Sequence, residues 1–282
     1  MNEVNQNNTK INFWFLVAVS GFMVLGGIVS IIFFVRTNML ANKKIAESAE
    51  ANRPANLDLI TITDSSCTDC FNINAVLDYI KKENVKVNSE KTLDKNSDEG
   101  KALIAQYSLK KLPAFVLKGE FDKVLNLAEF FSKTGDITED TFIFRQVGAP
   151  YTDTDTGAVK GRIKLSLLTD ISCTECYDVT QHELILKESF GIDTTANVVD
   201  TKSSAGQALI RTYKIKLVPT IVLSGETDEY PGLKSVWSQV GVVASDGAYV
   251  FTTGVPLMGT YKDLTTNKVV TPAPPAQTSA QE

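Results

Sequence analysis

The sequence has few of the residues that most catalytic sites use. It contains four cysteines and a single histidine, His182, among 282 residues. It also lacks a basic excess, because 28 Lys and Arg stand against 33 Asp and Glu, for a net charge of -5. We find no phosphate-cradling glycine loop, no Ser-His-Asp set and no basic-aromatic surface motif. The sequence therefore gives no reason to expect a nucleic-acid partner, and it gives no reason to expect a bound cofactor.

One long stretch, 13–35, lacks charge altogether. A membrane span needs roughly 20 apolar helical residues, so this stretch predicts a transmembrane helix. A short polar N-terminus (1–12) precedes it, and a helical polar stalk (36–56) follows it. The alternative is a cleaved signal peptide, whose apolar region usually has about 7 to 15 residues and is followed by a cleavage site that we do not find here.

The charges around this stretch bear on its orientation. Lys10 is the only basic side chain before it, whereas Arg36, Lys43, Lys44 and Arg53 follow it. The positive-inside rule would place the bulk of the protein in the cytoplasm, but a large domain behind one N-terminal anchor is typical of export, and long domains translocate largely regardless of charge. We therefore expect a single-pass membrane protein with its soluble domains outside the cytoplasm.

All four cysteines lie in two Cys-x-x-Cys pairs within nearly the same sequence. "TDSSCTDCFNI" begins at Thr63 and "TDISCTECYDV" at Thr169. The offset of 106 residues between Cys67 and Cys173 also aligns Pro113 with Pro219 without a gap. The other matched pairs are Asp94 and Asp200, Gly100 and Gly206, Tyr107 and Tyr213, Gly148 and Gly254, and Pro150 and Pro256. This predicts two domains, 57–160 and 161–268, and a disordered tail, 269–282, rich in Pro, Ala, Ser and Gln.

Within each repeat the signals come in the same order. The alternating runs "LDLITIT" and "IKLSLLT" predict strands that lead directly into the cysteine pairs. A helix follows; in the first repeat Ile73, Val76, Leu77 and Ile80 share one face. Later strands are indicated at "NVKVNSE" and "TTANVVD", and at the segments that follow Pro113 and Pro219. The pattern is that of an α/β protein.

This order, with a Cys-x-x-Cys pair between a strand and a helix and a proline before a later strand, resembles the thioredoxin superfamily. Two such modules in one chain are similar to tandem protein disulfide oxidoreductases and isomerases. The resemblance implies, behind the transmembrane helix, two tandem thioredoxin-like domains, each with a central mixed sheet flanked by helices. It also implies thiol-disulfide exchange with protein or peptide thiols and disulfides, and a redox partner.

The same resemblance assigns roles to residues. Cys67 and Cys173 are the attacking thiols, and Cys70 and Cys176 resolve the mixed disulfide. The prolines that precede the later strands are expected to be cis and to lie beside the sulfurs, and the residue before each offers backbone hydrogen bonds to a bound peptide. The substrate-binding residues are then Leu112, Pro113, Val218 and Pro219.

The sequence departs from ordinary thioredoxins in two ways. Neither pair has the Trp-Cys-Gly-Pro-Cys sequence, and Thr61 and Leu167 stand where thioredoxin has its buried acid. Asp64 and Asp170, three residues before the cysteines, are candidates for proton transfer, but we favour an Asx-turn that leads into the helix.

The acids inside the pairs fit a capping box. With Ser66 and Ser172 as N-caps, Asp69 and Glu175 fall at N3. Each first cysteine then lies at a helix N-terminus, where the helix dipole lowers the pKa of its thiol. The nearby acid opposes this shift.

Two other interpretations remain open. Zinc ribbons usually place their cysteine pairs about 15 to 20 residues apart, whereas 103 residues separate Cys70 from Cys173 here, but each pair could still hold two-coordinate Cu(I). His182 falls opposite Val76, so it has no role common to both sites, and we expect a solvated helix position. The third interpretation is a non-enzymatic protein whose disulfide-stapled domains bind a partner.

Overall fold

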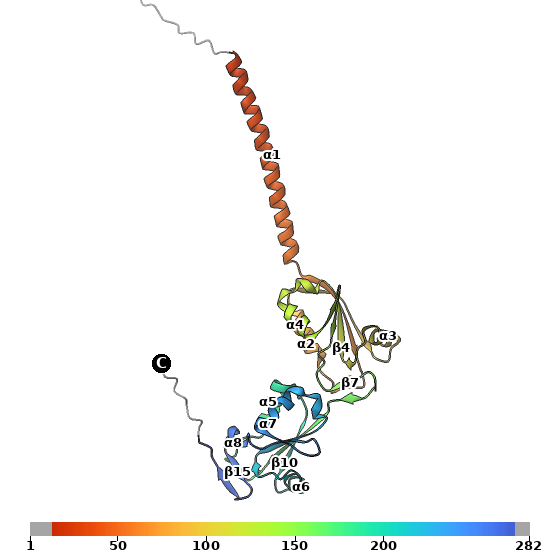
Figure 1. Ribbon diagram of the computed structural model, residues 1–282, viewed down its shortest axis with the longest axis vertical. Coiled ribbons are helices and arrows are strands. Elements are labelled where there is room, and N and C mark those ends of the chain that lie inside the picture. Colours follow the sequence, from red (N-terminus) through yellow and green to blue (C-terminus); the bar gives the residue numbers. More distant parts are fainter. Residues whose placement is uncertain (1–12, 274–282) are drawn as a thin grey trace, which may run out of the picture. The chain divides into compact units, whose positions relative to one another are not determined.

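The computed structural model describes residues 13–273, with side chains from Ser30 onward (Figure 1). The predicted N-terminus (1–12) and the tail from residue 274 lie outside the described residues. The chain divides into two compact units, Met1–Ala55 and Asn56–Glu282. The first contains one helix of 40 residues, α1 (Phe13–Asn52), which runs through much of the segment predicted as a helical stalk.

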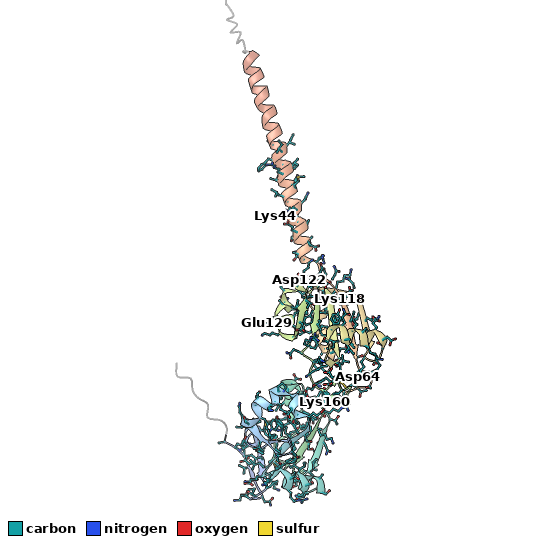
Figure 2. The ribbon with its side chains drawn as sticks, turned by 45° about the vertical axis from the view of Figure 1, so that its right-hand side comes forward. Lys44, Asp64, Lys118, Asp122, Glu129 and Lys160 are labelled. Atoms are coloured by element: carbon teal, nitrogen blue, oxygen red, sulfur yellow. A yellow bond between two sulfur atoms is a disulfide. The ribbon has the colours of Figure 1, made fainter. Side chains whose placement is uncertain are left out.

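The predicted transmembrane helix is wrong. In the part of the chain that the structure describes, no helix is long and apolar enough to cross a membrane. Charged side chains occur on α1 from Arg36 onward. Farther along, α1 carries further charges, among them Lys44, which Figure 2 shows projecting from the helix.

Module 1 is built from β1 to β8 and has a five-stranded sheet in the order β2-β1-β4-β6-β5. The alternating burial of β1 follows its alternating sequence. The strands of this sheet are β1 (Ala55–Thr63), β2 (Val85–Asp94), β4 (Ala114–Gly119), β5 (Gly135–Thr138) and β6 (Thr141–Phe144). A second, three-stranded sheet joins β3 (Lys111–Leu112), β7 (Tyr151–Asp153) and β8 (Val159–Lys160). The helices are α2 (Ile73–Lys81), α3 (Asp98–Tyr107) and α4 (Ala128–Thr134), with 3-10 turns at Phe121–Lys123 and Leu125–Leu127.

Module 2 is built from β9 to β16 and repeats this topology, with the sheet order β10-β9-β12-β14-β13. Its sheet is mixed, because β10 runs parallel to β9 and β12 runs antiparallel to it. The strands are β9 (Ile163–Thr169), β10 (Ala196–Asp200), β12 (Thr220–Gly225), β13 (Gly241–Val243) and β14 (Tyr249–Phe251); β11 (Leu217–Val218), β15 (Tyr261–Asp263) and β16 (Lys268–Val270) form the small sheet. The helices are α5 (Gln181–Phe190), α6 (Ser204–Tyr213), α7 (Pro231–Val240) and α8 (Val255–Met258), with a 3-10 turn at Thr227–Glu229.

The α/β class with mixed sheets is therefore confirmed, while the domain boundaries at 57, 161 and 268 stay predictions. In each module helices cover both faces of the five-stranded sheet (Figure 1). α2 buries Ile73, Leu77 and Ile80 and leaves Val76 half-buried, which confirms the predicted helix face. On the face that α4 covers, phenylalanines dominate the core, and the Phe131 and Phe142 rings lie 4.7 Å apart.

Two glycines of the repeat have a steric explanation. Gly100 and Gly206 occupy the first turns of α3 and α6, and a Cβ at either position would overlap a backbone carbonyl oxygen, that of Asp94 or Asp200. The helix can approach the preceding strand this closely only without a side chain. The match in the sequence therefore reflects a packing requirement that both modules share.

Candidate active site: two cysteine pairs

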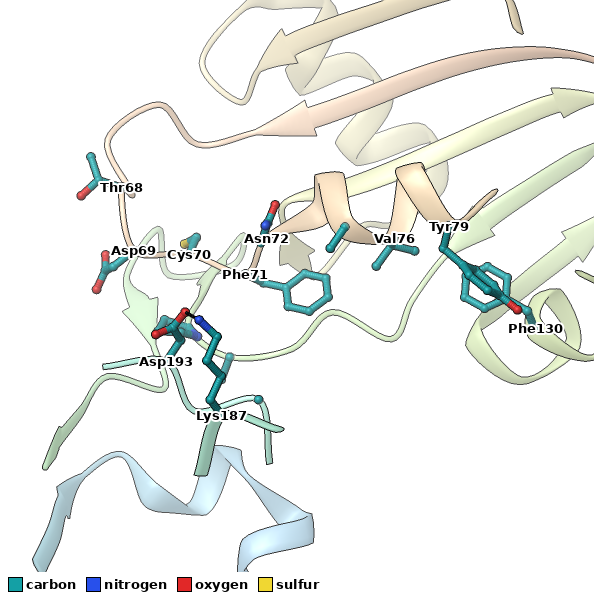
Figure 3. A pocket seen from close by; sticks show the side chains of 14 residues that line it. Thr68, Asp69, Cys70, Phe71, Asn72, Val76, Tyr79, Phe130, Lys187 and Asp193 are labelled. Carbon is teal, nitrogen blue, oxygen red and sulfur yellow. Dashed lines mark ion pairs between the residues drawn. The ribbon is translucent and has the colours of Figure 1, made fainter. Parts of the chain in front are cut away.

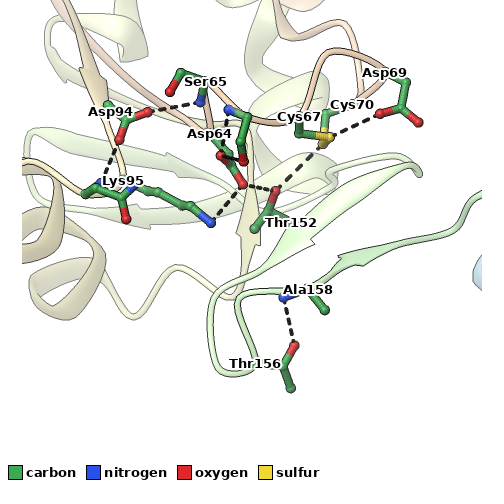
Figure 4. Close-up of polar contacts among 12 residues, drawn as sticks. Asp64, Ser65, Cys67, Asp69, Cys70, Asp94, Lys95, Thr152, Thr156 and Ala158 are labelled. Atoms are coloured by element: carbon green, nitrogen blue, oxygen red, sulfur yellow. Dashed lines mark hydrogen bonds and ion pairs between the residues drawn. A yellow bond between two sulfur atoms is a disulfide. The ribbon is translucent and has the colours of Figure 1, made fainter.

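Both predicted cysteine pairs are closed as disulfides. Cys67 is bonded to Cys70 and Cys173 to Cys176, with Cα–Cα distances of 5.5 and 5.4 Å. Figure 4 shows the first of these disulfides. All four residues are half-buried, so each pair is open to another molecule. Both pairs lie in the loop between a central strand and the helix that follows it.

The predicted capping box is wrong, because the helices begin later than expected. α2 starts at Ile73 and α5 at Gln181, so the cysteines lie before the helices and not in their first turns. The reason is a competing side-chain interaction: Ser66 donates both its backbone N–H and its hydroxyl to Asp64 Oδ1, at 2.9 and 2.5 Å. Ser172 does the same with Asp170. Without a helix start at the cysteines, the helix dipole cannot be the cause of a lowered thiol pKa.

These contacts confirm the predicted Asx-turns at Asp64 and Asp170. They also show more than a turn, because the Asp64 side chain is only 2% exposed and contacts Lys95 Nζ at 2.8 Å. Burial opposes ionisation of Asp64, but hydrogen bonds from Lys95, Ser66 and Thr152 outweigh it and hold the pKa of this carboxyl well below its usual range. Asp64 is therefore an anion that only accepts hydrogen bonds.

The second module has its own buried carboxylate. Lys262 Nζ lies 2.7 Å from Asp170 Oδ2, and Lys202 Nζ lies 3.7 Å from Oδ1. The hydrogen bond from Lys262, helped by those from Ser172, keeps the pKa of Asp170 well below its usual range despite burial. Asp170 therefore remains ionised like Asp64, but a different set of lysines surrounds it.

The acid inside the first pair has a partner far away in the sequence. Arg162, between β8 and β9, contacts both carboxylate oxygens of Asp69 at 2.8 Å. Cys67 Sγ lies 3.6 Å from Asp69 Oδ1 (Figure 4). The hydrogen bond from Arg162 lowers the pKa of Asp69. Asp69 therefore sits beside the predicted attacking sulfur as a carboxylate already paired with a guanidinium.

The prolines are cis, as the resemblance implied. The Leu112–Pro113 and Val218–Pro219 peptide bonds are both cis, and so is Ala149–Pro150. Pro113 lines, with Cys67 and Cys70, a pocket of about 320 Å³. Leu112 and Val218 are buried, and both belong to strands already paired in the small sheets. Their role in binding a substrate peptide stays a prediction.

Cys70 also borders a larger pocket of about 710 Å³ (Figure 3). Phe71, Val76, Tyr79 and Phe130 give it an apolar wall. An ion pair between Lys187 and Asp193, 2.8 Å apart, lies at its border. The pocket therefore places an apolar surface beside the second sulfur of module 1.

The prediction for His182 is wrong, because this residue is buried and not solvated. It is 3% exposed, and its Nε2 lies 3.1 Å from the Tyr177 hydroxyl. That hydroxyl donates to the backbone oxygen of Pro219 at 2.8 Å, so its lone pair accepts from the histidine, which carries its proton on Nε2. Burial lowers the pKa of His182 to about 4. The neutral ring therefore donates to the Tyr177 hydroxyl, and that hydroxyl in turn binds the backbone of the cis proline in module 2.

Several site residues could not have been found in the sequence. Thr152 Oγ1 lies 3.8 Å from Cys70 Sγ, and Lys95 and Lys262 neutralise the two buried carboxylates. The repeat gives no signal for them, because the offset of 106 residues lays Lys95 over Thr201 and Thr152 over Met258.

The metal interpretation finds no larger ligand set in the structure. Within residues 13–273, no three His, Cys, Asp or Glu side chains come together as a metal site. Two-coordinate Cu(I) requires only the two sulfurs of one pair, so this alternative is left to experiment.

Comparison with known proteins gives structural likenesses only. No family model matches the chain, and no curated protein matches it. Solved structures that resemble it include the NTD_N/C domain of alkylhydroperoxide reductase AhpF from Enterococcus faecalis, 16% identical, covering 66% of this chain and 90% of that one, with a TM-score of 0.20. A protein disulfide oxidoreductase from Aeropyrum pernix is also 16% identical, covering 62% of this chain and 78% of that one, with a TM-score of 0.17. Scores this low carry no argument about function.

The chain's own geometry supports the resemblance to the thioredoxin superfamily. In both modules a central strand leads into a Cys-x-x-Cys disulfide, a helix follows, and a cis proline precedes the next central strand. The arrangement predicted from the sequence is confirmed in these respects, and the helix start is the main departure from it.

Proposed function

We propose that the chain is a thiol-disulfide oxidoreductase that exchanges disulfides with protein or peptide thiols. The observation that carries the proposal is the repeated site: a half-buried Cys-x-x-Cys disulfide near a buried, ionised aspartate, with a cis proline directly before the strand that pairs with the one leading into the cysteines. A disulfide that closes so short a loop adds little to stability through chain entropy. This favours a role in thiol-disulfide exchange over a purely structural role.

In the oxidising direction, a substrate thiolate attacks Cys67 Sγ and breaks its bond to Cys70, which leaves as a thiolate and takes a proton. A second substrate thiolate then attacks the substrate sulfur of the mixed disulfide and releases Cys67. Two electrons have moved from the substrate to the pair. The reverse sequence reduces a substrate disulfide, and in either direction a second protein thiol or disulfide must restore the pair.

Trapping tests this proposal. Cys70→Ser and Cys176→Ser each leave the attacking thiol without the thiol that resolves the mixed disulfide, so substrates should accumulate as adducts on diagonal gels. The matched controls are Cys67→Ser with Cys70→Ser and Cys173→Ser with Cys176→Ser, which should trap nothing. Absence of adducts from both single variants would favour a staple, or a metal site if reduced protein retains copper or zinc that the double variants lose.

Location outside the cytoplasm stays a prediction, and the helix that motivated it is not supported as a membrane span. Labelling intact cells with a membrane-impermeant thiol reagent after mild reduction checks it. Labelling that requires lysis would overturn it.

A further inference from the structure

Thr152 connects the first disulfide to the buried carboxylate beneath it. It is fully buried on β7, where it pairs with Leu112, the residue before the cis proline. Its Oγ1 lies 2.8 Å from Asp64 Oδ2 and 3.8 Å from Cys70 Sγ. Figure 4 marks both contacts with dashed lines. The hydroxyl is therefore the polar group that stands between the sulfur and the carboxylate.

The chemistry of the neighbours fixes the direction of these hydrogen bonds. Asp64 is ionised and only accepts, so Thr152 must be the donor in the bond between them. A threonine hydroxyl has one hydrogen, and the bond to Asp64 uses it. Only oxygen lone pairs are then left to face Cys70, and these can accept a hydrogen bond from a thiol but oppose a thiolate.

We propose that Thr152, held by Asp64, keeps the proton on Cys70 when the first pair is reduced. The reduced Cys70 S–H donates to Thr152 Oγ1, and this leaves Cys67 as the sulfur that ionises and attacks. The assignment of Cys67 as the attacking thiol and Cys70 as the resolving thiol rests on the proposed function. The position of the proton on Cys70 does not depend on it. Asp64 and Lys95 act as positioning residues, because they fix the hydroxyl and do not touch the sulfur.

The charged groups around Cys70 form pairs that largely offset one another. This leaves the orientation of the neutral hydroxyl as the feature that distinguishes the two protonation states. The pairs are Lys95 with Asp64, Arg162 with Asp69, and Lys187 with Asp193 at the border of the larger pocket.

The test uses the full chain with Cys67, Cys173 and Cys176 replaced by serine, so that Cys70 is the only thiol. The rate of iodoacetamide alkylation against pH gives its pKa. Thr152→Val should lower this pKa by about half a unit, which makes alkylation below the midpoint roughly threefold faster. Thr152→Ser keeps the hydroxyl and should leave the profile unchanged. Thr154→Val is the matched control, because that hydroxyl donates to the Leu109 backbone oxygen and not toward the sulfur.

A second arm reverses the hydrogen bonds. Asp64→Asn supplies an amide that can donate to Thr152, which frees the threonine hydrogen to point at the sulfur. In that background Thr152→Val should raise the pKa of Cys70, so the effect of the same substitution changes sign. An unchanged or raised pKa in Thr152→Val alone, or no change of sign with Asp64→Asn, would overturn the proposal.

This experiment involves no turnover and no substrate. Failure of the proposed function would show as missing mixed disulfides while the alkylation profiles still shift. Failure of the Thr152 proposal would show as unshifted profiles while trapping succeeds. Circular dichroism checks that each variant is folded. If Thr152→Val is unfolded on its own, the comparison of Asp64→Asn with Asp64→Asn plus Thr152→Val tests the proposal instead.

Discussion

Thr152 and Lys262 occupy equivalent positions in the two modules. Thr152 pairs with Leu112 and Lys262 pairs with Val218, and each partner precedes a cis proline. Both side chains reach the buried aspartate of their module, at 2.8 and 2.7 Å. One is a neutral hydroxyl and the other an ammonium, so two sites with the same backbone have different electrostatics.

Each aspartate still has a close lysine, but the lysine comes from a different place in the fold. In module 1 it is Lys95, which directly follows β2, and in module 2 it is Lys262 on β15. Module 2 adds a second cation, Lys202, 3.7 Å from the carboxylate. The surroundings of the buried Asp170 carboxylate are therefore more positive than those of Asp64.

This difference predicts unequal reduction potentials. Positive charge stabilises thiolates and therefore the reduced form, so the Cys173–Cys176 pair should be the stronger oxidant. We expect its potential to be higher by about 30 mV, which is a tenfold difference in the exchange equilibrium. Titration against glutathione, with the other pair replaced by serine each time, measures both values. Equal potentials, or a higher value for the first pair, would contradict this.

Lys262 should also matter for stability. Its removal in Lys262→Met leaves the Asp170 carboxylate, 3% exposed, without its closest cation. Loss of one partner of a buried pair costs about 3 kcal/mol of unfolding free energy. Lys202→Met is the matched control, because this lysine is 65% exposed and should cost less than about 1 kcal/mol. Urea denaturation at pH 7 compares them.

The pH dependence of the same variant follows from the pKa of Asp170. It lies below the ordinary value of 3.8, so the stabilisation is present above 3.8 and is lost as pH falls below it. The difference between wild type and Lys262→Met should therefore shrink in strong acid. A difference that stays constant down to that range would show that the ion pair is not its source.

Asp69 and Arg162 should act on Cys67 in opposite directions. The carboxylate lies 3.6 Å from the sulfur and favours the thiol, so Asp69→Asn should lower the pKa of Cys67. Arg162→Gln removes the cation that offsets this carboxylate and should raise the same pKa. Alkylation profiles of a chain with Cys67 as its only cysteine give both shifts. Shifts of the same sign would mean that the ion pair does not control the thiol.

Local signals in the sequence predicted much of this site. The alternation of β1 and β9, the cysteine pairs and the Asx-turns at Asp64 and Asp170 depend on neighbouring residues, and all are present. The helix start failed because the same aspartates compete for the serines that were expected to cap the helix. Thr152 comes from 88 residues away, and only the folded sheet brings it to Asp64. The hydrophobic periodicities of strands and helices do not predict this contact between Thr152 and Asp64.

His182 illustrates the same limit, since it falls opposite Val76 in the repeat and was expected at a solvated helix position. In the structure its ring lies 4.7 Å from the Phe251 ring, and its Nε2 contacts Tyr177. Phe251 comes from β14, which is distant in the sequence. The burial of His182 therefore depends on residues that are distant in the sequence, and its neighbours in the chain do not predict it.

The buried histidine predicts a loss of stability in mild acid. Its pKa is about 4 in the folded chain and 6.5 in the reference state, so between these values the unfolded chain binds more protons. Stability should therefore fall as pH decreases from about 6.5 to about 4, by roughly 3 kcal/mol in total. His182→Leu removes the titrating group and should remove this slope, although it is expected to be less stable at pH 7 because the Tyr177 contact is lost. Urea denaturation of both proteins at a series of pH values between 4 and 7 measures the slopes. Parallel slopes would mean that the ring is accessible to protons in the folded chain, against the burial described above.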